Sequence, residues 1–269
     1  MGAYIAYIWK EWREALRGKG FWLIMGLFAL LSVLMLWQAR TFPAEQGLKL
    51  YLLSLYELEV YLVPLLALFF SAMSVLQEKE QKTMLLLVVK REKPATFLWK
   101  KGIAVQFTIL PSVLLLKLVL VLPLKILFAF AWSGYLPYVA VLLALWLVFN
   151  QMGVAAGAFC GNKMQLAGAA VALWFLFVFA ADTVLLYLLP TVTAENMALF
   201  STLYFIDPLH ALHFYLETAF GFFPLEHMSR VMKQMVMLSP AAYVALDLAV
   251  WLPLLSALAV FAGRRVAQQ

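Results

Sequence analysis

Long apolar runs separated by short polar stretches make up most of this 269-residue chain. Six runs are long enough to cross a bilayer as helices, which takes about 20 apolar residues each. They are continuous rather than alternating over ten-residue segments, which argues against a β-barrel. The sequence therefore predicts an all-α integral membrane protein with one transmembrane domain over residues 1–269. The predicted spans are 21–37, 61–76, 103–122, 136–159, 166–189 and 242–262.

An amphipathic segment, residues 4–17, precedes the first run. One side of the helix it predicts is apolar, with Tyr4, Ile5, Ile8, Trp12, Ala15 and Leu16. The other side is charged, with Lys10, Glu11, Arg13, Glu14 and Arg17. We expect an elbow helix lying on the membrane surface. A cleaved signal peptide is disfavoured because the apolar run that follows is too long and has no small-residue cleavage site.

The densest charge lies between the second and third runs, in residues 77–101. Ten of these twenty-five residues are Lys, Arg or Glu, and seven are basic. Such a segment cannot lie in lipid, so we expect a cytoplasmic hairpin of short helices, with Pro94 opening the next span. The charges could dock on a soluble partner, or they could be a solvated cluster that only orients the chain.

Charge distribution predicts the orientation. With both termini in the cytoplasm, fourteen Lys and Arg residues lie inside, five lie outside, and Lys117 lies within a span. This agrees with the positive-inside rule. The net charge of +6 is concentrated at span ends, which favours a role in orientation over nucleic-acid binding. The single cysteine, Cys160, cannot form an internal disulfide.

Residues 190–241 are predicted to form an external helical segment between spans five and six. Asp207 followed by Pro208 is typical of a helix start, and we expect a helix over 207–220. His210, His213 and Glu217 share one face of it. They could bind copper or zinc, or they could form a polar face that contacts a partner or water.

Two ionisable residues are predicted inside the membrane. Asp182 lies about 10 Å below the outer end of span five, and Lys117 lies at a similar depth in span three. An unpaired charge there is costly, so each should face the interior, a cavity or the other residue. A functional contact on a transport path and a structural ion pair both stay open. Asp247, nearer the outer surface, is expected to be hydrated.

Specific motifs connect this layout to a known family. They are Thr83-Met84-Leu85-Leu86-Leu87 in the hairpin and, around span five, Asn162-Lys163, Ala167-Gly168, Trp174-Phe175-Leu176-Phe177-Val178, Asp182 and Leu185-Leu186. With them the chain resembles the membrane subunit of a type-2 ABC exporter, and within that family the NosY permeases of nitrous oxide reductase maturation. No G-x-x-x-x-G-K-[ST] motif occurs, so ATP should be hydrolysed by another polypeptide.

The resemblance implies a non-catalytic permease subunit of the bacterial inner membrane, acting as a homodimer. Its implied partners are a cytoplasmic ATPase subunit, which holds ATP and Mg, and a periplasmic accessory subunit; copper or a sulfur species is the implied cargo. The implied ATPase-coupling residues are Glu78, Lys79, Glu80, Lys82, Thr83, Met84, Arg91 and Lys93. The residues expected to dock the periplasmic partner are Asp207, His210, His213 and Glu217.

Two other functions stay open at this point. A generic type-2 exporter of lipid, glycan or drug would have the same architecture. An intramembrane enzyme using Asp182 or the histidines is disfavoured, because H-E-x-x-H and a second matched intramembrane carboxylate are lacking.

Overall fold

The computed structural model describes all residues except 1, 44–45, 82–93, 194, 224–234 and 267–269. Within the described residues the regular structure is helical, without strands. The longer helices are α1 (Gly2–Arg17), α2 (Lys19–Gln38), α3 (Gly47–Glu80), α5 (Pro94–Leu127), α6 (Trp132–Phe159), α7 (Lys163–Phe175), α8 (Ala181–Leu188), α9 (Met197–Phe205), α10 (Pro208–Phe220) and α12 (Pro240–Val266).

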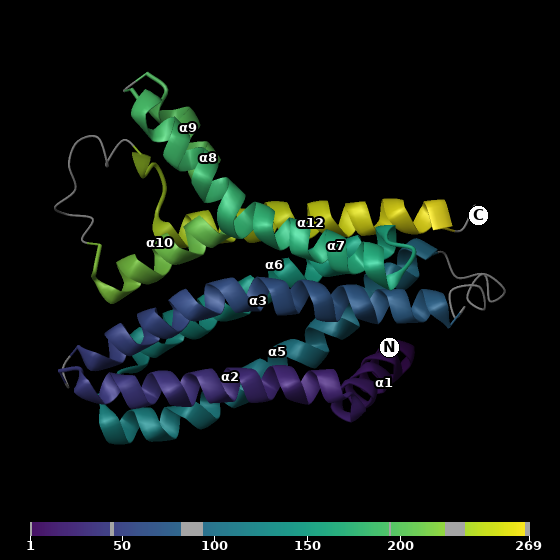
Figure 1. The fold of residues 1–269 in the computed structure, drawn as a ribbon, viewed down its shortest axis with the longest axis horizontal. Coiled ribbons are helices and arrows are strands. Elements are labelled where there is room, and N and C mark those ends of the chain that lie inside the picture. Colours follow the sequence, from purple (N-terminus) through teal and green to yellow (C-terminus); the bar gives the residue numbers. More distant parts are fainter. Residues whose placement is uncertain (1, 44–45, 82–93, 194, 224–234, 267–269) are drawn as a thin grey trace.

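Among the described residues, six helical segments are long and apolar enough to cross a membrane, which agrees with the prediction of an all-α membrane protein with six spans. They run side by side in Figure 1. We call the end where α3 ends and α5 begins the hairpin end, and both termini lie there. The opposite end, next to α10, is the far end. The six segments are Lys19–Thr41, Gly47–Glu80, Thr96–Leu127, Trp132–Phe159, Lys163–Thr191 and Pro240–Gly263.

Helix α6 is the centre of the bundle. In its most apolar stretch 83% of the residues are buried, against 17% or less in α2, α12 and the fifth span. Gly153 and Gly157, one turn apart, let α6 lie directly against α3: a Cβ atom at Gly153 would lie 2.6 Å from the Leu68 carbonyl oxygen. This is the close packing that G-x-x-x-G motifs permit between membrane helices.

The second span begins much earlier than predicted. Residues 47–60, which the predicted spans left in a loop between the first and second spans, form the first four turns of α3. Leu48, Tyr51, Leu55 and Glu59 are buried along this stretch, and they recur at the three- and four-residue spacing of a helical face. The helix therefore extends past the purely apolar run, with Glu59 facing the interior.

The fifth span is divided by a π-helical turn, Leu176–Ala180 (η2), between α7 and α8. The Asn162 side chain caps the start of α7 by accepting a hydrogen bond from the Gln165 amide at 2.8 Å. In Figure 1 the second half of this span leans away from the other helices and leads to α9.

Two helices outside the spans match the sequence closely. Helix α1 covers the predicted elbow. Helix α10 begins at Pro208 with Asp207 as its N-cap, which accepts from the Leu209 amide at 2.9 Å. It ends at Gly221, whose φ of 78° is the left-handed conformation that glycine adopts readily. The elbow was predicted from an amphipathic pattern and α10 from its capping residues, and packing against the rest of the protein leaves both helices in place.

Candidate functional site

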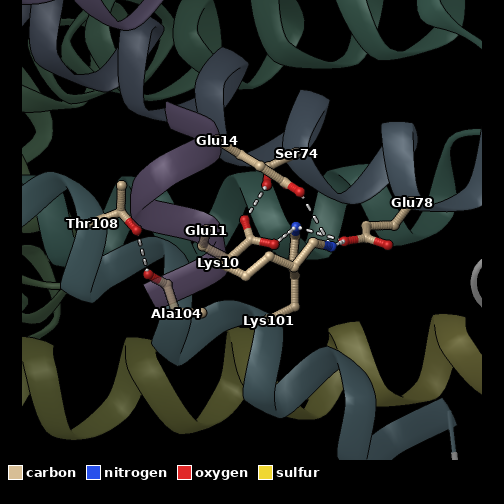
Figure 2. A network of polar contacts seen from close by, with 8 residues as sticks. All are labelled: Lys10, Glu11, Glu14, Ser74, Glu78, Lys101, Ala104 and Thr108. Carbon is tan, nitrogen blue, oxygen red and sulfur yellow. Dashed lines mark hydrogen bonds and ion pairs between the residues drawn. The ribbon is translucent and has the colours of Figure 1, made fainter. Parts of the chain in front are cut away.

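A buried charge cluster at the hairpin end joins α1, α3 and α5 (Figure 2). The Lys101 ammonium of α5 lies 2.6 Å from Glu11 Oε1 of α1 and 3.3 Å from Glu78 Oε1 of α3. All three side chains are buried. We call these residues, with Lys10 and Ser74, the elbow cluster. Buried charges are tolerated only when they are paired and hydrogen-bonded, so these contacts fix the three helices to one another.

Lys10 and Ser74 complete the elbow cluster. Lys10 Nζ lies 3.2 Å from Glu78 Oε1, and Ser74 Oγ donates to Glu11 Oε2 at 3.3 Å. Partial burial lowers the pKa of Lys10, but the neighbouring Glu78 carboxylate outweighs that effect and leaves the pKa above its ordinary value. Glu11, on the charged side of the predicted elbow, points into the bundle, which the amphipathic pattern alone did not predict.

The described coupling residues have internal roles as well as exposed ones. Glu78 belongs to the elbow cluster. Lys79 donates to the carbonyl oxygens of Ala158 at 2.5 Å and Cys160 at 2.9 Å, a cation at the carboxyl end of α6. Glu80 is exposed and lies 3.4 Å from Lys163. The other predicted coupling residues, Lys82, Thr83, Met84, Arg91 and Lys93, lie outside the described residues.

A second ion pair lies inside the bundle, in the half nearer the far end. Lys117 of α5 pairs with Glu59 of α3, and the two side chains are 1% and 0% exposed. Tyr138 of α6 donates to Glu59 Oε2 at 2.6 Å, and Tyr135 donates to the Lys117 carbonyl oxygen at 2.5 Å. Lys117 therefore faces the interior as predicted, but the suggested pairing of Lys117 with Asp182 is wrong. Glu59 had been assigned to a loop and was missed.

The far end carries a histidine between two carboxylates. His210 Nε2 of α10 lies 2.7 Å from Asp182 Oδ1 of α8, and its Nδ1 lies 3.5 Å from Asp207 Oδ2. Burial lowers the pKa of His210, but Asp207 and Asp182 outweigh this effect and raise the pKa above its ordinary value. His210 thus links the fifth span to the start of α10, and its charge strengthens the link.

The other two residues of the expected metal set pair with each other. His213 Nε2 lies 3.2 Å from Glu217 Oε1, and the His213 ring lies 5.7 Å from that of Tyr56. Among the described residues, no group of three or more His, Cys, Asp or Glu side chains is arranged to hold a metal ion. His210, His213 and Glu217 share a helix face as predicted, but His210 pairs with Asp182 while His213 pairs with Glu217.

Asp247 of α12 departs from expectation. It is buried rather than hydrated, and its Oδ2 atom has no hydrogen-bond partner within the described part of the chain. Trp251 lies one turn further along the same face of α12 and donates to the Ile206 carbonyl oxygen at 2.8 Å. This face of α12 therefore packs against the helical segments that precede it.

An open cavity of about 450 Å³ adjoins the far-end histidine. Its polar lining comes from α3, α8, α9 and α10, with Glu57, Tyr61, Asp182, Tyr204, His210 and His213. Burial, reinforced by the nearby carboxylates, raises the pKa of Tyr204 to about 12. The cavity can therefore accept cationic or hydrogen-bonding groups.

One of the three clusters lies at the hairpin end of the bundle, and the other two lie in the half nearer the far end. Each joins helices that are distant in sequence, and none has the nucleophile and base geometry of a catalytic site within the described residues. No protein-family model matches the chain, and no curated protein matches it.

Proposed function

We propose that this chain is the permease subunit of a NosY-like type-2 ABC exporter, acting as a homodimer with separate ATPase subunits. Six membrane-spanning helices, an elbow helix and a charged segment between α3 and α5 support this assignment. The excess of Lys and Arg at the hairpin end supports an orientation with both termini in the cytoplasm of a bacterial inner membrane.

The elbow cluster is the observation that carries the proposal. The segment between α3 and α5 is flanked by Glu78 and Lys101, and both contact one another and the elbow. A displacement of that segment by an ATPase would therefore act on α1, α3 and α5 together. Buried, paired charges make this connection stiff, because separating them would leave an ionised group in a region of low dielectric.

The far end contains a contact that would pass such a movement to the periplasmic side. Asp182 and His210 connect the fifth span to α10, so movement of the span would reach α10. We infer that α10 docks a periplasmic accessory subunit through His213 and Glu217, which are 37% and 33% exposed. Asp207 and His210, expected to take part, are 6% and 13% exposed and are held by contacts within the chain. The sequence motifs of span five favour copper-site assembly of nitrous oxide reductase as the process served, with copper or a sulfur species as cargo.

The principal test is charge reversal in the hairpin, with Glu80→Lys and Lys82→Glu combined. Glu80 is exposed, so the reversed chain should still insert and fold. We expect loss of ATPase binding and stimulation, measured by copurification and by phosphate release. The matched control reverses one base and one acid at the far end, Arg40→Glu with Glu57→Lys, and should leave both intact. Normal ATPase stimulation by the hairpin variant, or ATP hydrolysis by the isolated chain, contradicts the proposal.

Single-cysteine labelling tests the orientation. In a Cys160→Ala background, a cysteine at Lys93 should react only from the cytoplasmic side, and cysteines at Glu195 or Lys233 only from the other side. Labelling at Lys93 and Lys233 from the same side contradicts the six-span arrangement. Copurification of a periplasmic repeat protein with the complex would support the NosY-like assignment over a generic exporter.

A further inference from the structure

A cavity of about 360 Å³ lies between the elbow and the hairpin ends of α2, α3 and α5. Protein interiors rarely contain voids much larger than a water molecule, so a cavity of this size is unusual. Its volume falls in the range of ligand-binding pockets. The elbow cluster forms part of its wall, since Glu11, Ser74, Glu78 and Lys101 all line it. Figure 2 shows these side chains converging between the three helices.

The lining changes from polar to apolar in the same direction on three separate elements. On α3 it runs inward from Gln81 and Glu78 to Phe70 and Phe69. Twelve residues at 1.5 Å each make this about 18 Å of helix. The change repeats from the carboxylates of α1 to Phe21 and Ile24 of α2, and from Lys101 to Val105 on α5.

The deeper polar lining residue on α5 does not reverse this gradient. Thr108 Oγ1 donates to the Ala104 carbonyl oxygen of its own helix at 2.8 Å, so its hydroxyl is already satisfied (Figure 2). The cavity thus has a charged end at the hairpin end of the bundle and an apolar end within the membrane-spanning region. This is the polarity profile of a membrane amphiphile.

Charge at the polar end selects the head group. Three carboxylates, Glu11, Glu14 and Glu78, line the cavity with one ammonium, Lys101. Lys101 already contacts Glu11 and Glu78. Glu14 is 59% exposed and its contact with Lys10 is long, at 3.6 Å, so its carboxylate is accessible to a ligand. Lys10 lies outside the lining but contacts Glu14 and Glu78, so the described charges at this end sum to one negative charge. That excess disfavours an anionic head group and favours one that ends in an ammonium.

We propose that this cavity binds a membrane lipid with an ammonium-bearing head group, of the phosphatidylethanolamine class, from the leaflet next to the hairpin end. The ammonium lies near Glu14, and the start of an acyl chain lies against Phe21, Ile24, Phe69 and Phe70. A lipid held here touches the elbow and both helices that flank the hairpin. The site does not depend on the transport function proposed above.

Native mass spectrometry of the full-length chain tests this site. The detergent-purified protein is incubated with phosphatidylethanolamine or phosphatidylglycerol of identical acyl chains. We expect retained phosphatidylethanolamine to exceed phosphatidylglycerol by about fivefold or more, and Glu14→Gln to remove most of that preference. Glu57→Gln, an exposed carboxylate at the far end, is the matched control and should keep it. Equal retention of the two lipids, or preference for the anionic one, overturns the proposal.

Filling the cavity gives an independent readout. Gly20 lines the cavity, and a Cβ atom there would meet nothing within 4 Å, so Gly20→Leu occupies space without a backbone clash. Gly26, on the same helix, is equally open but lies outside the cavity lining. We expect Gly20→Leu to reduce lipid retention several-fold and Gly26→Leu to leave it unchanged, with equal thermal stability of the two variants. Equal lipid retention by both variants would refute the site. Retention of dodecylammonium without any retention of phosphatidylethanolamine would also refute a phospholipid and indicate a simple amine as the ligand.

Discussion

The two ends of the bundle hold their helices together with different chemistry. At the hairpin end, Lys101 contacts Glu11 and Glu78, and all three side chains are buried. At the far end, His210 contacts an Asp182 carboxylate whose side chain is 56% exposed. The first connection is a lysine with carboxylates enclosed by protein, and the second is an imidazole with a carboxylate that the protein leaves partly uncovered beside the far-end cavity.

This difference predicts how each connection responds to pH. Histidine is the side chain whose ordinary pKa puts its charge change between about pH 5 and 8. The connection between α8 and α10 depends on a histidine, so it should weaken as pH rises.

The largest effect is expected from Lys101→Met. This change leaves two buried carboxylates, Glu11 and Glu78, without their central cation. Removing one partner from a buried ionic group costs about 3–5 kcal/mol, and we expect a loss of that size in the free energy of unfolding. Reversible unfolding in mixed micelles of SDS measures it.

The matched control for this variant is Lys163→Met. Lys163 also pairs with a glutamate, Glu80, but the two side chains are 63% and 42% exposed. An exposed pair contributes about 0–1 kcal/mol. A loss below about 1 kcal/mol for Lys101→Met, equal to that of the control, would show that the elbow cluster does not hold the three helices together.

A smaller and pH-dependent effect is expected from Asp182→Asn. The folded-state pKa of His210 is raised, so the protonated histidine stabilises the fold. The stabilisation is complete below the ordinary histidine pKa of about 6.5, and it is lost as pH rises through the raised folded-state value. The variant should be less stable than wild type by about 0.5–1 kcal/mol at pH 5.5, since the protein encloses the Asp182 side chain only in part.

The difference between wild type and Asp182→Asn should shrink toward zero by about pH 8.5, where histidine is neutral. Unfolding measured across this pH range checks the prediction. Glu57→Gln removes another carboxylate from the same cavity and is the control. A difference that grows with pH would reverse the sign and exclude His210 as the titrating group.

The sequence predicted the spans well because bilayer thickness and apolar run length determine them almost alone. Local capping also predicted α10 correctly, since Asp207 and Pro208 act within one turn of the helix start. The start of α3 was missed because residues 38–60, which include Glu59, were assigned to a loop between the first two spans. Its spacing with Tyr51, Leu52 and Leu55 on one helical face was a usable signal.

Apolar runs and capping residues could not predict which charged side chains pair with one another. The need for Lys117 to be paired follows from its depth, but Glu59, Asp182 and Asp247 were all acidic residues in or near spans. Which one faces Lys117 depends on how α3 and α5 rotate about their axes, and the Gly153 contact between α3 and α6 helps to fix the rotation of α3. Similarly, the burial of Glu11 depends on where α1 packs, which a single amphipathic helix does not specify.

The smallest effect is expected from His213→Gln, and it distinguishes the two histidines of α10. His213 pairs with Glu217 one turn away on the same helix, and both side chains are about one-third exposed, at 37% and 33%. Such a pair contributes about 0.3–0.5 kcal/mol, and losing it leaves α8 and α10 joined through His210. The variant should therefore keep the pH profile of wild type, with a uniform loss below about 0.5 kcal/mol in the same unfolding measurement. If the pH dependence instead disappears in His213→Gln and persists in Asp182→Asn, the titrating contact lies within α10. The far end would then have no pH-dependent connection between its helices, and its contrast with the hairpin end would be one of solvent exposure alone.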